Sequence, residues 1–339
     1  MPHVKSLALK TLIKSYIRNY TRNTHGKRWT SLEKALAIAI YKKSPRVYRH
    51  LKHLLALPSI RTLQTVLQSI ELEPGISSTT IDHLKKKAEK SNEKDRMCAL
   101  LFDEIALKKR LVFNPRTDKV EGFLDIGENH YRSPEKADHA LVFMLQGLHK
   151  KIKQPIAYYF VHKTISSQGL AVLIKDVIKT VTDIGYTVIT TVCDQGPTNI
   201  GSLNLLKEWC GIPASSNYFL VDGVKVFIMF DIPHLFKSIR YNFHSGGVIV
   251  IDGKKGKWSH LIEVAKKNKT TLHFKKLTTL HVNPTFKSKM KVKLAAQVLS
   301  NTVAAILKLM AEKYSDQVEA QEILETAQIV EDLDRLFDC

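Results

Sequence analysis

Two aspartates each follow a short apolar run that predicts a β-strand. Asp103 comes directly after the run from Ala99 to Phe102, and Asp194 follows the run from Val188 to Cys193. If the two strands are neighbours in one sheet, the carboxylates meet at one edge and can share divalent ions, as two-metal phosphoryl transfer requires. An aspartate at a strand end is often only a turn former. The pair, rather than either residue alone, therefore indicates a metal site.

The six residues that begin at Asp194, DQGPTN, predict a turn ahead of a helix from Ile200 to Trp209. The glycine and the proline allow a sharp change of chain direction. Thr198 and Asn199 can cap that helix, which is a structural alternative to a catalytic role for this motif.

A second strand-to-helix junction contains Asp231 and His234. Asp231 is a natural N-cap with Pro233 in the first turn, and this structural role is favoured over direct catalysis. His234 is either a ligand or a first-turn hydrogen-bonding residue. A Cys/His nucleophile is not indicated, because no second motif orients such a pair. Neither of the glycine-rich nucleotide-binding motifs occurs, and the segment from Gly253 to Lys257 predicts only a basic loop.

The elements that must position these residues form an α/β pattern. One amphipathic helix from about Ser167 to Ile184 lies between the fourth and fifth of six β-rich apolar runs. The order of these elements predicts an α/β mixed sheet. The six runs are Ala99 to Phe102, Val120 to Leu124, Ala140 to Leu145, Ile156 to Val161, Thr187 to Val192 and Val224 to Phe230.

The segment from Trp29 to Ile70 predicts three short helices. Ser31 can cap the first helix, and Ser44-Pro45 ends it and starts the second, whose apolar face is Val47, Leu51, Leu54 and Leu55. The third helix leaves Arg61, Gln64 and Gln68 on its outer face. The arrangement is that of a helix-turn-helix unit with its last helix placed to enter a DNA groove. A three-helix packing or protein-contact module is the alternative.

Charge favours a polyanionic partner. The 339-residue chain has a formal net charge of +20, and the segment from Met1 to His53 holds 13 Lys or Arg against one acid, Glu33. Nucleic acid is the leading candidate, and a generally basic surface is the alternative. By contrast, the segment from Glu312 to Asp338 has nine acids and two bases.

Other segments carry less information. The lysine-rich stretch 76–95 predicts a helical or loose linker, and the part beyond Ile239 predicts a mostly helical region with helices at about Met290 to Met310 and Val318 to Phe337. The four cysteines lack the spacing of a zinc module and indicate reduced intracellular thiols. Secretion and membrane spanning are not expected, because no run of about 18 apolar residues is found.

Five ordered motifs resemble those of the P element-type DNA transposases, including the THAP-domain transposase group. The segment Ala56 to Leu63 is also similar to the helix-turn-helix segment of that family. The resemblance covers roughly residues 20 to 339. The five motifs are Phe102 to Ile105, Asp138 to Met144, Gln154 to Phe160, Cys193 to Asn199 and Phe230 to Leu235.

The resemblance implies an RNase H-like fold that cuts and joins DNA with Mg²⁺ and is interrupted by a GTP-binding insertion. It makes Asp103 and Asp194 the first two metal-binding carboxylates, in agreement with their strand-end positions. By similarity, Lys276, Lys291 and Ser300 would contact GTP. Phe337 and Asp338 would help to recognise guanine, since a carboxylate can accept from both N–H donors of its edge. Each lysine taken singly is also consistent with a solvated basic face.

Two features of the family are not found in this sequence. The cysteine and histidine ligands of its DNA-binding zinc finger are missing, and so is the third carboxylate, a Glu beyond the insertion. Glu319, Glu322 and Glu325 lie at helical spacing within the insertion and predict a solvent face. With two carboxylates instead of three the metal position is poorly fixed, so we expect a catalytically impaired chain.

The sequence thus predicts a nuclear, P element-like DNA transposase that acts on transposon ends and target DNA as a homo-oligomer, with Mg²⁺ and GTP and without a membrane. One alternative is a transposase-derived DNA-binding regulator without catalytic activity, and another is a GTP-binding module without DNA chemistry. The expected domains are a basic helix-turn-helix region (1–75), a linker (76–95), an RNase H-like catalytic domain (96–240) and a GTP-binding insertion (241–339).

Overall fold

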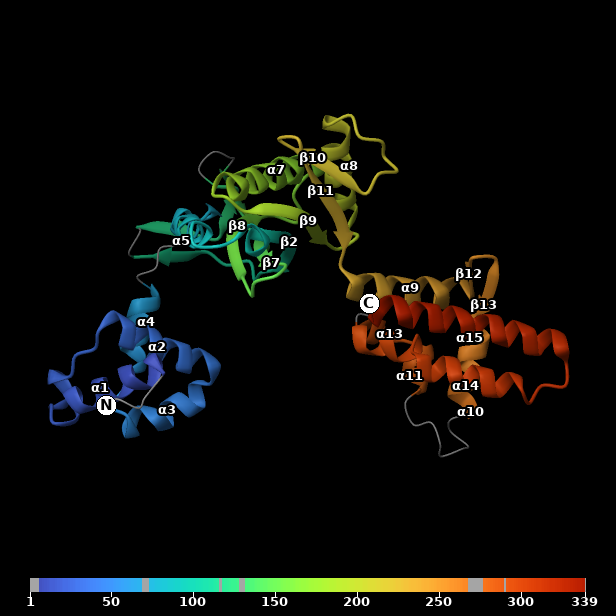
Figure 1. Ribbon diagram of the computed structural model, residues 1–339, viewed down its shortest axis with the longest axis horizontal. Helices are drawn as coiled ribbons and strands as arrows, with labels where there is room; N and C mark the ends of the chain where they lie inside the picture. The colour runs from blue at the N-terminus through green and yellow to red at the C-terminus, as the bar shows by residue number, and fades with distance from the viewer. Residues whose placement is uncertain are drawn as a thin grey trace. The chain divides into compact units, whose positions relative to one another are not determined.

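The computed structural model describes residues 6–68, 73–115, 118–127, 132–267, 277–289 and 291–338. The chain divides into two compact units, Met1–Glu73 and Pro74–Cys339, which are traced from blue to red in Figure 1.

The first unit is helical. Thr30, not the predicted Ser31, is the N-cap of α2: its side chain accepts from the Glu33 backbone N–H, and the Glu33 carboxylate accepts from the Thr30 backbone N–H. Ser44 caps α3 and Pro45 opens it, as predicted. The helices are α1 (Leu7–Tyr20), α2 (Ser31–Lys43), α3 (Pro45–Leu54) and α4 (Ile60–Gln68), with a short 3₁₀ turn, η1 (Thr24–Gly26), after α1.

Tyr48 is at the centre of the core of this unit. Its ring is fully buried, and its hydroxyl donates to the Pro58 carbonyl over 2.8 Å, which fixes the turn between α3 and α4. The predicted apolar face of α3 was partly wrong, because Val47 and Leu54 are more than half exposed. The helix is rotated so that Tyr48 enters the core in their place. The outer face predicted for α4 is confirmed, since Arg61, Gln64 and Gln68 are all exposed.

The second unit contains the predicted mixed sheet. Its strand order is β10-β11-β9-β2-β7-β8-β5-β6, with β1 added on β8. The strands β2, β9 and β11 run parallel, and β7 and β8 run antiparallel beside β2. The strands are β1 (Gly75–Ile76), β2 (Met97–Ala106), β5 (Phe123–Asp125), β6 (Arg132–Lys136), β7 (His139–Gly147), β8 (Lys153–Val161), β9 (Thr187–Cys193), β10 (Tyr218–Val221) and β11 (Val224–Phe230). A separate hairpin joins β3 (Val112–Asn114) and β4 (Lys119–Glu121).

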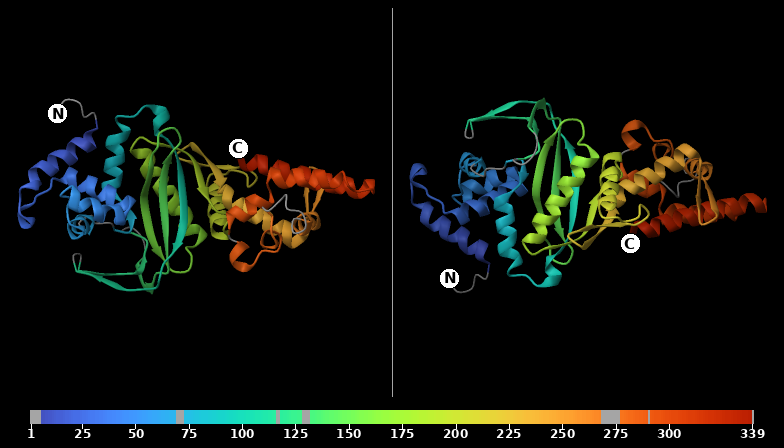
Figure 2. Two further views of the ribbon diagram at one scale, coloured as in Figure 1. Left: turned by 90° about the horizontal axis from the view of Figure 1, so that it is seen from below. Right: turned by 90° about the horizontal axis from the view of Figure 1, so that it is seen from above.

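Two helices pack beside this sheet and each other, α7 (Ser167–Asp183) and α8 (Pro197–Trp209), as Figure 2 shows. Alternate side chains of the central strands face this helical layer. Cys98, Leu100 and Phe102 of β2 are buried in one core with the apolar face of α7, whereas the intervening residues are less covered toward the strand's end. Period-two burial of this kind gives the sheet a helix-covered face and a more open one.

The segment 76–95 is part of this sheet domain and does not form a linker. It contains α5 (Ser78–Ala88) and α6 (Glu93–Arg96), and Gly75–Ile76 pairs with β8. Leu84 and Ala88 are buried in the sheet core. Its polar composition misled the prediction, because only one narrow face of α5 is apolar.

The remaining elements form a mostly helical region with its own core. Phe236 and Phe243 of α9 belong to that core, so α9 packs with the insertion, although it was predicted as the end of the catalytic domain. The elements are α9 (Ile232–Gly246), β12 (Val248–Ile251), β13 (Lys254–Lys257), α10 (Trp258–Lys267), α11 (Thr279–Val282), α12 (Phe286–Lys289), α13 (Val292–Val298), α14 (Asn301–Ala311) and α15 (Gln317–Asp338).

The expected basic loop and the expected solvent-facing acids bind each other. Lys254–Lys257 is strand β13, and the Lys257 ammonium donates to Glu322 of α15. Glu325 accepts from the Lys255 backbone N–H over 2.9 Å. Two of the three predicted solvent-facing glutamates therefore hold the hairpin against α15.

One apolar stretch was missed by the sequence reasoning. Residues Val292–Ala311 are long and apolar enough to cross a membrane by length and composition alone. In the structure this stretch is divided at Leu299 and Ser300 into α13 and α14, and Val298, Leu299 and Leu307 are fully buried in the helical core. Its apolar character is explained by packing inside the region.

Candidate active site

Strand pairing places Asp103 and Asp194 side by side. On the parallel neighbours β2 and β9, Leu101 is the partner of Val192, so each aspartate lies two residues beyond a paired residue. Continuation of this register brings the two side chains to the same, less covered face, at a backbone separation of about 4.8 Å. The two strands are neighbours in one sheet, as predicted. Asp194 directly follows β9, but Asp103 lies inside β2, three residues before its end, and does not follow the strand as predicted.

The electrostatics of Cys193 support this placement. Burial, followed by the negative charges of Asp194 and Asp103, raises the pKa of its thiol to about 12. Both carboxylates therefore act on the same buried group, and the thiol stays protonated at neutral pH.

One oxygen of each carboxylate is held by the protein. Asp103 Oδ1 accepts from the Glu104 backbone N–H over 2.8 Å. Asp194 Oδ1 accepts from the Gly196 backbone N–H over 2.9 Å and from Asn199 Nδ2 over 2.6 Å. Within the described ranges, neither Oδ2 accepts a hydrogen bond, so each carboxylate keeps one oxygen that the protein does not engage.

The turn after β9 orients Asp194. Gly196 is the N-cap of α8 and Pro197 its first residue, so the predicted capping by Thr198 or Asn199 was wrong. Asn199 instead turns back to the Asp194 carboxylate. An added Cβ at Gly196 would lie 3.0 Å from Asp194 Oδ1, which is close enough to displace it. The glycine thus leaves room for the carboxylate.

Asp231 performs the structural role that was favoured for it. Its side chain caps α9 by accepting from the His234 backbone N–H over 3.2 Å, and it binds His234 Nδ1 over 2.5 Å. Phe230 is the register partner of Cys193, so the capped end of α9 begins one strand away from Asp194. Both contacts are made by Oδ2, so the first turn of α9 sets the position of the Asp231 carboxylate.

The donor chemistry of the Asp103 and Asp194 pair fits a hard divalent cation. Carboxylate oxygens are the ligands that Mg²⁺ prefers, and two neighbouring carboxylates can bridge two such ions. In the part of the chain that the structure describes, no group of three or more His, Cys, Asp or Glu side chains is arranged to hold a metal ion. The two aspartates therefore form a partial donor set.

Basic side chains gather at the same edge of the sheet, around Asp138. His139, the first residue of β7, pairs with Ala106, the last residue of β2. The group around Asp138 therefore lies about three residues beyond Asp103 in the direction of β2. Asp138 binds Lys109 over 3.2 Å and His139 over 2.9 Å, and His162 Nδ1 lies 3.4 Å away. The His139 hydrogen bond, followed by those from Lys163 and Lys109, lowers the pKa of Asp138 below its ordinary value. Sequence reasoning used Asp138 only as part of a motif and missed this group.

Three of the five predicted GTP residues lie on or beside helices of this region that pack in pairs, α13 with α9 and α14 with α15. The Phe337 ring packs on Phe236 of α9, with 4.4 Å between centroids. Ser300 precedes Asn301, whose backbone N–H donates to Asp334, one turn before Phe337, over 2.9 Å. Lys291 is exposed at the N-cap of α13, which packs on α9. Lys276 and the Asp338 side chain lie outside the described residues.

The Ser300 hydroxyl already has a partner. It donates to the Gln297 carbonyl over 2.9 Å and makes no capping bond to α14. As an acceptor the same oxygen retains lone pairs, so it can take a further bond from a ligand.

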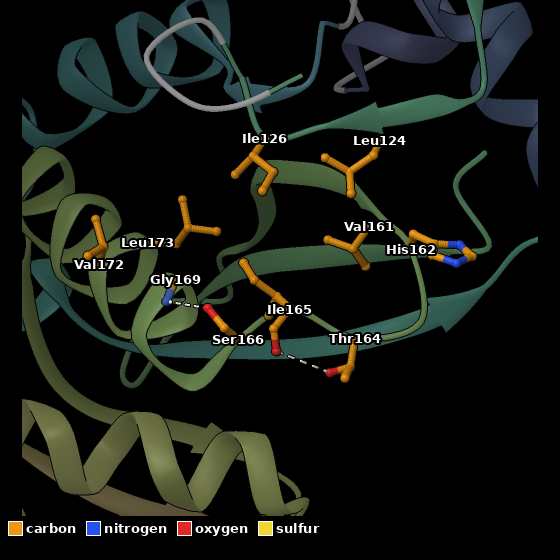
Figure 3. Close-up of a pocket in the computed structure, with 10 residues that line it drawn as sticks. All are labelled: Leu124, Ile126, Val161, His162, Thr164, Ile165, Ser166, Gly169, Val172 and Leu173. Atoms are coloured by element: carbon orange, nitrogen blue, oxygen red, sulfur yellow. Dashed lines mark hydrogen bonds between the residues drawn. The ribbon is translucent and has the colours of Figure 1, made fainter. Parts of the chain in front are cut away.

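A separate hollow of about 350 Å³ lies between β5, β8 and α7. Figure 3 shows Leu124 and Ile126 above it and Val172 and Leu173 beside it. His162 and Thr164 are its main polar groups, and neither predicted carboxylate lines it. We therefore do not assign the metal chemistry to this hollow.

Comparisons with known proteins match two parts of the chain. Residues 72–207 match the TNP-like, RNase H N-terminal domain, and residues 233–339 match the TNP-like, GTP-binding insertion domain. The first range includes the segment expected to be a linker, and the second begins in α9, in agreement with the packing.

Two curated relatives match most of this chain. It is 27% identical over 312 residues to the Transposable element P transposase of Drosophila melanogaster. This alignment covers 89% of this chain and 37% of that protein. It is 25% identical over 312 residues to DNA transposase THAP9 of Homo sapiens, and this alignment covers 90% of this chain and 34% of that protein. The chain thus spans about a third of the length of these relatives.

A solved structure matches nearly the whole chain. The Drosophila P element transposase strand transfer complex aligns with a TM-score of 0.73 and 26% identity, over 97% of this chain and 71% of that chain. The similarity therefore extends across the helical first unit, the sheet and the helical region.

Proposed function

Because the chain belongs to the P element transposase family, we propose that it acts in DNA transposition, with Asp103 and Asp194 as two metal-binding carboxylates of an RNase H-like active site. The observation that carries this proposal is the in-register position of the two aspartates on β2 and β9, each with one free oxygen.

The two carboxylates would hold Mg²⁺. When bound, the ions supply charge that stabilises the phosphate transition state and lower the pKa of a bound water or hydroxyl. Asn199 and Gly196 keep Asp194 in its orientation, and the Glu104 N–H does the same for Asp103. The protein thus fixes its ligands before any metal binds, which lowers the cost of reorganisation.

The first unit would supply DNA contacts. Glu33, the only acid between Met1 and His53, is buried and bound by Arg18, so the outward charge of this segment is positive. Phosphate backbone binding follows from such a surface. We propose transposon ends and target DNA as partners, through the helix-turn-helix formed by α3 and α4. The same chemistry implies a nuclear location, and the two ends of a transposon suit a homo-oligomer.

GTP is the second proposed ligand. The support is the matched GTP-binding insertion domain and the gathering of Lys291, Ser300 and Phe337 around α9 and the end of α15. Lys276 and Asp338 belong to the same proposal by resemblance.

A DNA-binding regulator without catalytic activity is the second candidate function. The partial donor set favours this candidate. Among the described residues no third ligand joins the two carboxylates, and two carboxylates fix metal ions less firmly than three. The regulator would bind the same DNA through the first unit and leave it uncut.

Metal binding and strand nicking test the proposal together. Mn²⁺ binding to the chain is measured by the decrease of the paramagnetic resonance signal of free Mn²⁺. This binding should disappear in Asp103→Asn and in Asp194→Asn. Asp222→Asn is the matched control, because Asp222 lies in the β10–β11 turn, at the opposite end of β11 from the proposed site. Undiminished Mn²⁺ binding by both site variants would refute the metal assignment. DNA binding without Mg²⁺-dependent nicking by the wild-type chain would favour the regulator.

A further inference from the structure

Helix α9 buries a guanidinium that has no acidic partner among the residues that the structure describes. Arg240 is 1% exposed and heads the fully buried side chains by volume. Its Nη2 donates to the carbonyls of Ser288 and Lys289, over 3.2 and 2.8 Å. Its Nε and Nη1 are buried without a hydrogen-bond partner, and none of the ion pairs found among the described residues includes it.

An unpaired buried cation is costly to keep. Burial disfavours the charged form and lowers the pKa of Arg240. A hydrophobic side chain of similar volume would remove that cost, and such replacements often stabilise proteins. Packing alone therefore does not explain why the site holds an arginine.

The surroundings of Arg240 add positive charge. His244, one turn later on α9, has a buried Nδ1 without a partner, and burial followed by the charges of Lys289 and Arg240 lowers its pKa. Lys289 Nζ lies 4.7 Å from the Tyr241 ring centroid. Lys289 thus adds positive charge beside the buried guanidinium, and the lowered pKa of His244 reflects that charge, which favours an anion nearby.

The backbone that Arg240 holds leads directly into the proposed nucleotide site. Lys291 follows Lys289 by two residues and is exposed at the start of α13. Phe236, one turn before Arg240, packs on Phe337. The backbone of Arg240 therefore lies about 6 Å along α9 from that of Phe236, whose ring contact with Phe337 marks the predicted base-binding end.

We propose that Arg240 is a positioning residue for a phosphate subsite: it holds the Ser288–Lys289 backbone and supplies buried positive charge, so that Lys289 and Lys291 bind the phosphates of a nucleoside triphosphate. The inference rests on the proposed GTP function and adds to it the residues that bind the phosphates. In the bound state the phosphate charge compensates the guanidinium, which gives a reason for an arginine at a position that a hydrophobic side chain could fill.

Thermal melting of the whole chain tests this role with inorganic tripolyphosphate and with GTP. Both should raise the melting temperature of the wild type by mass action. Arg240→Met should leave the ligand-free melting temperature unchanged or higher, abolish the tripolyphosphate shift and weaken GTP binding by at least about tenfold. Lys289→Met should lose the same shift, which covers the case in which Arg240→Met does not fold.

Phe243→Leu is the packing control, because Phe243 is buried in the same helix between Arg240 and His244. It should lower the melting temperature and keep the tripolyphosphate shift. A purely structural arginine would behave like this control, and that result would overturn the proposal. A wild type stabilised by GTP but not by tripolyphosphate would overturn the phosphate subsite and leave the GTP function intact. A wild type stabilised by neither ligand would refute both. If a DNA oligonucleotide raised the melting temperature and neither tripolyphosphate nor GTP did, the positive charge around Arg240 would be assigned to DNA binding instead.

Discussion

Asn199 Nδ2 donates to Asp194 Oδ1 over 2.6 Å, across the turn that joins β9 to α8. The contact ties the orientation of a proposed metal ligand to the first turn of a helix. Loss of a residue that orients a metal ligand typically lowers metal affinity by about 10- to 100-fold.

Asn199→Ala should therefore weaken Mn²⁺ binding by about tenfold, since an outer partner of a metal ligand is lost. Gly196→Ala should act in the same direction, because its Cβ would crowd the same oxygen. Calorimetric titration measures both. Asn204→Ala, exposed on the same helix, is the control and should bind Mn²⁺ like the wild type. Unchanged affinity in Asn199→Ala would show that this hydrogen bond is only a turn contact.

DNA binding should weaken steeply with salt, because phosphate contacts release counterions. Arg61→Ala, at the outer face of α4, should lower affinity, and the slope of log affinity against log salt should fall by about 0.9 if the side chain meets a phosphate. Fluorescence anisotropy with a labelled duplex measures the slope. Lys313→Ala, exposed in the helical region, is the control. Affinity that stays flat between low and physiological salt would contradict a phosphate-binding first unit.

Thr30→Ala should destabilise the first unit by about 1 kcal/mol, because it removes the capping bond to the Glu33 N–H. Urea unfolding followed by circular dichroism measures the change. Ser31→Ala is the matched control, since Ser31 is the exposed first residue of α2, and it should change stability by less than about 0.5 kcal/mol. If the two substitutions lowered the free energy of unfolding equally, the capping box would not be the cause of the destabilisation.

Lys291→Met should weaken GTP binding by about tenfold, the loss expected for a charge-assisted phosphate contact. Because Lys291 is exposed, the melting temperature of the free protein should not change. Lys293→Met, which removes a second exposed lysine two residues further on, is the comparison. If the two variants lose affinity equally, the effect is general charge and not a specific contact.

Local patterns predicted α7 and the strands β2, β7, β8, β9 and β11, because these have a strong apolar period. The predicted run Val120 to Leu124 was wrong as one strand, since it is divided between β4 and β5, and β6 and β10 were not predicted. The pattern failed at α1, whose buried residues are Ser15 and Asn19. Asn19 is buried because it accepts from the Arg28 backbone N–H and donates to the Ser15 and Arg28 carbonyls. Helices that pack through polar contacts leave no apolar stripe to detect.

The candidate site was predictable only in part, for a similar reason. Asp103 and Asp194 end apolar runs, so their convergence follows once the two strands are assumed to pair. Arg240 gives no such signal, because its burial depends on carbonyls 48 and 49 residues away in the chain. The contact between Phe236 and Phe337 likewise depends on the fold of the helical region.

The parallel register of β2 and β9 has a kinetic consequence for the proposed metal site. Both strands are flanked on each side by another strand of the sheet, so fraying from an edge does not reach them. Separating the backbones that carry Asp103 and Asp194 requires the central ladder to open cooperatively. The spacing of the two strands therefore has the lifetime of the folded domain, whereas the orientation of the Asp194 carboxylate depends also on the turn that holds it.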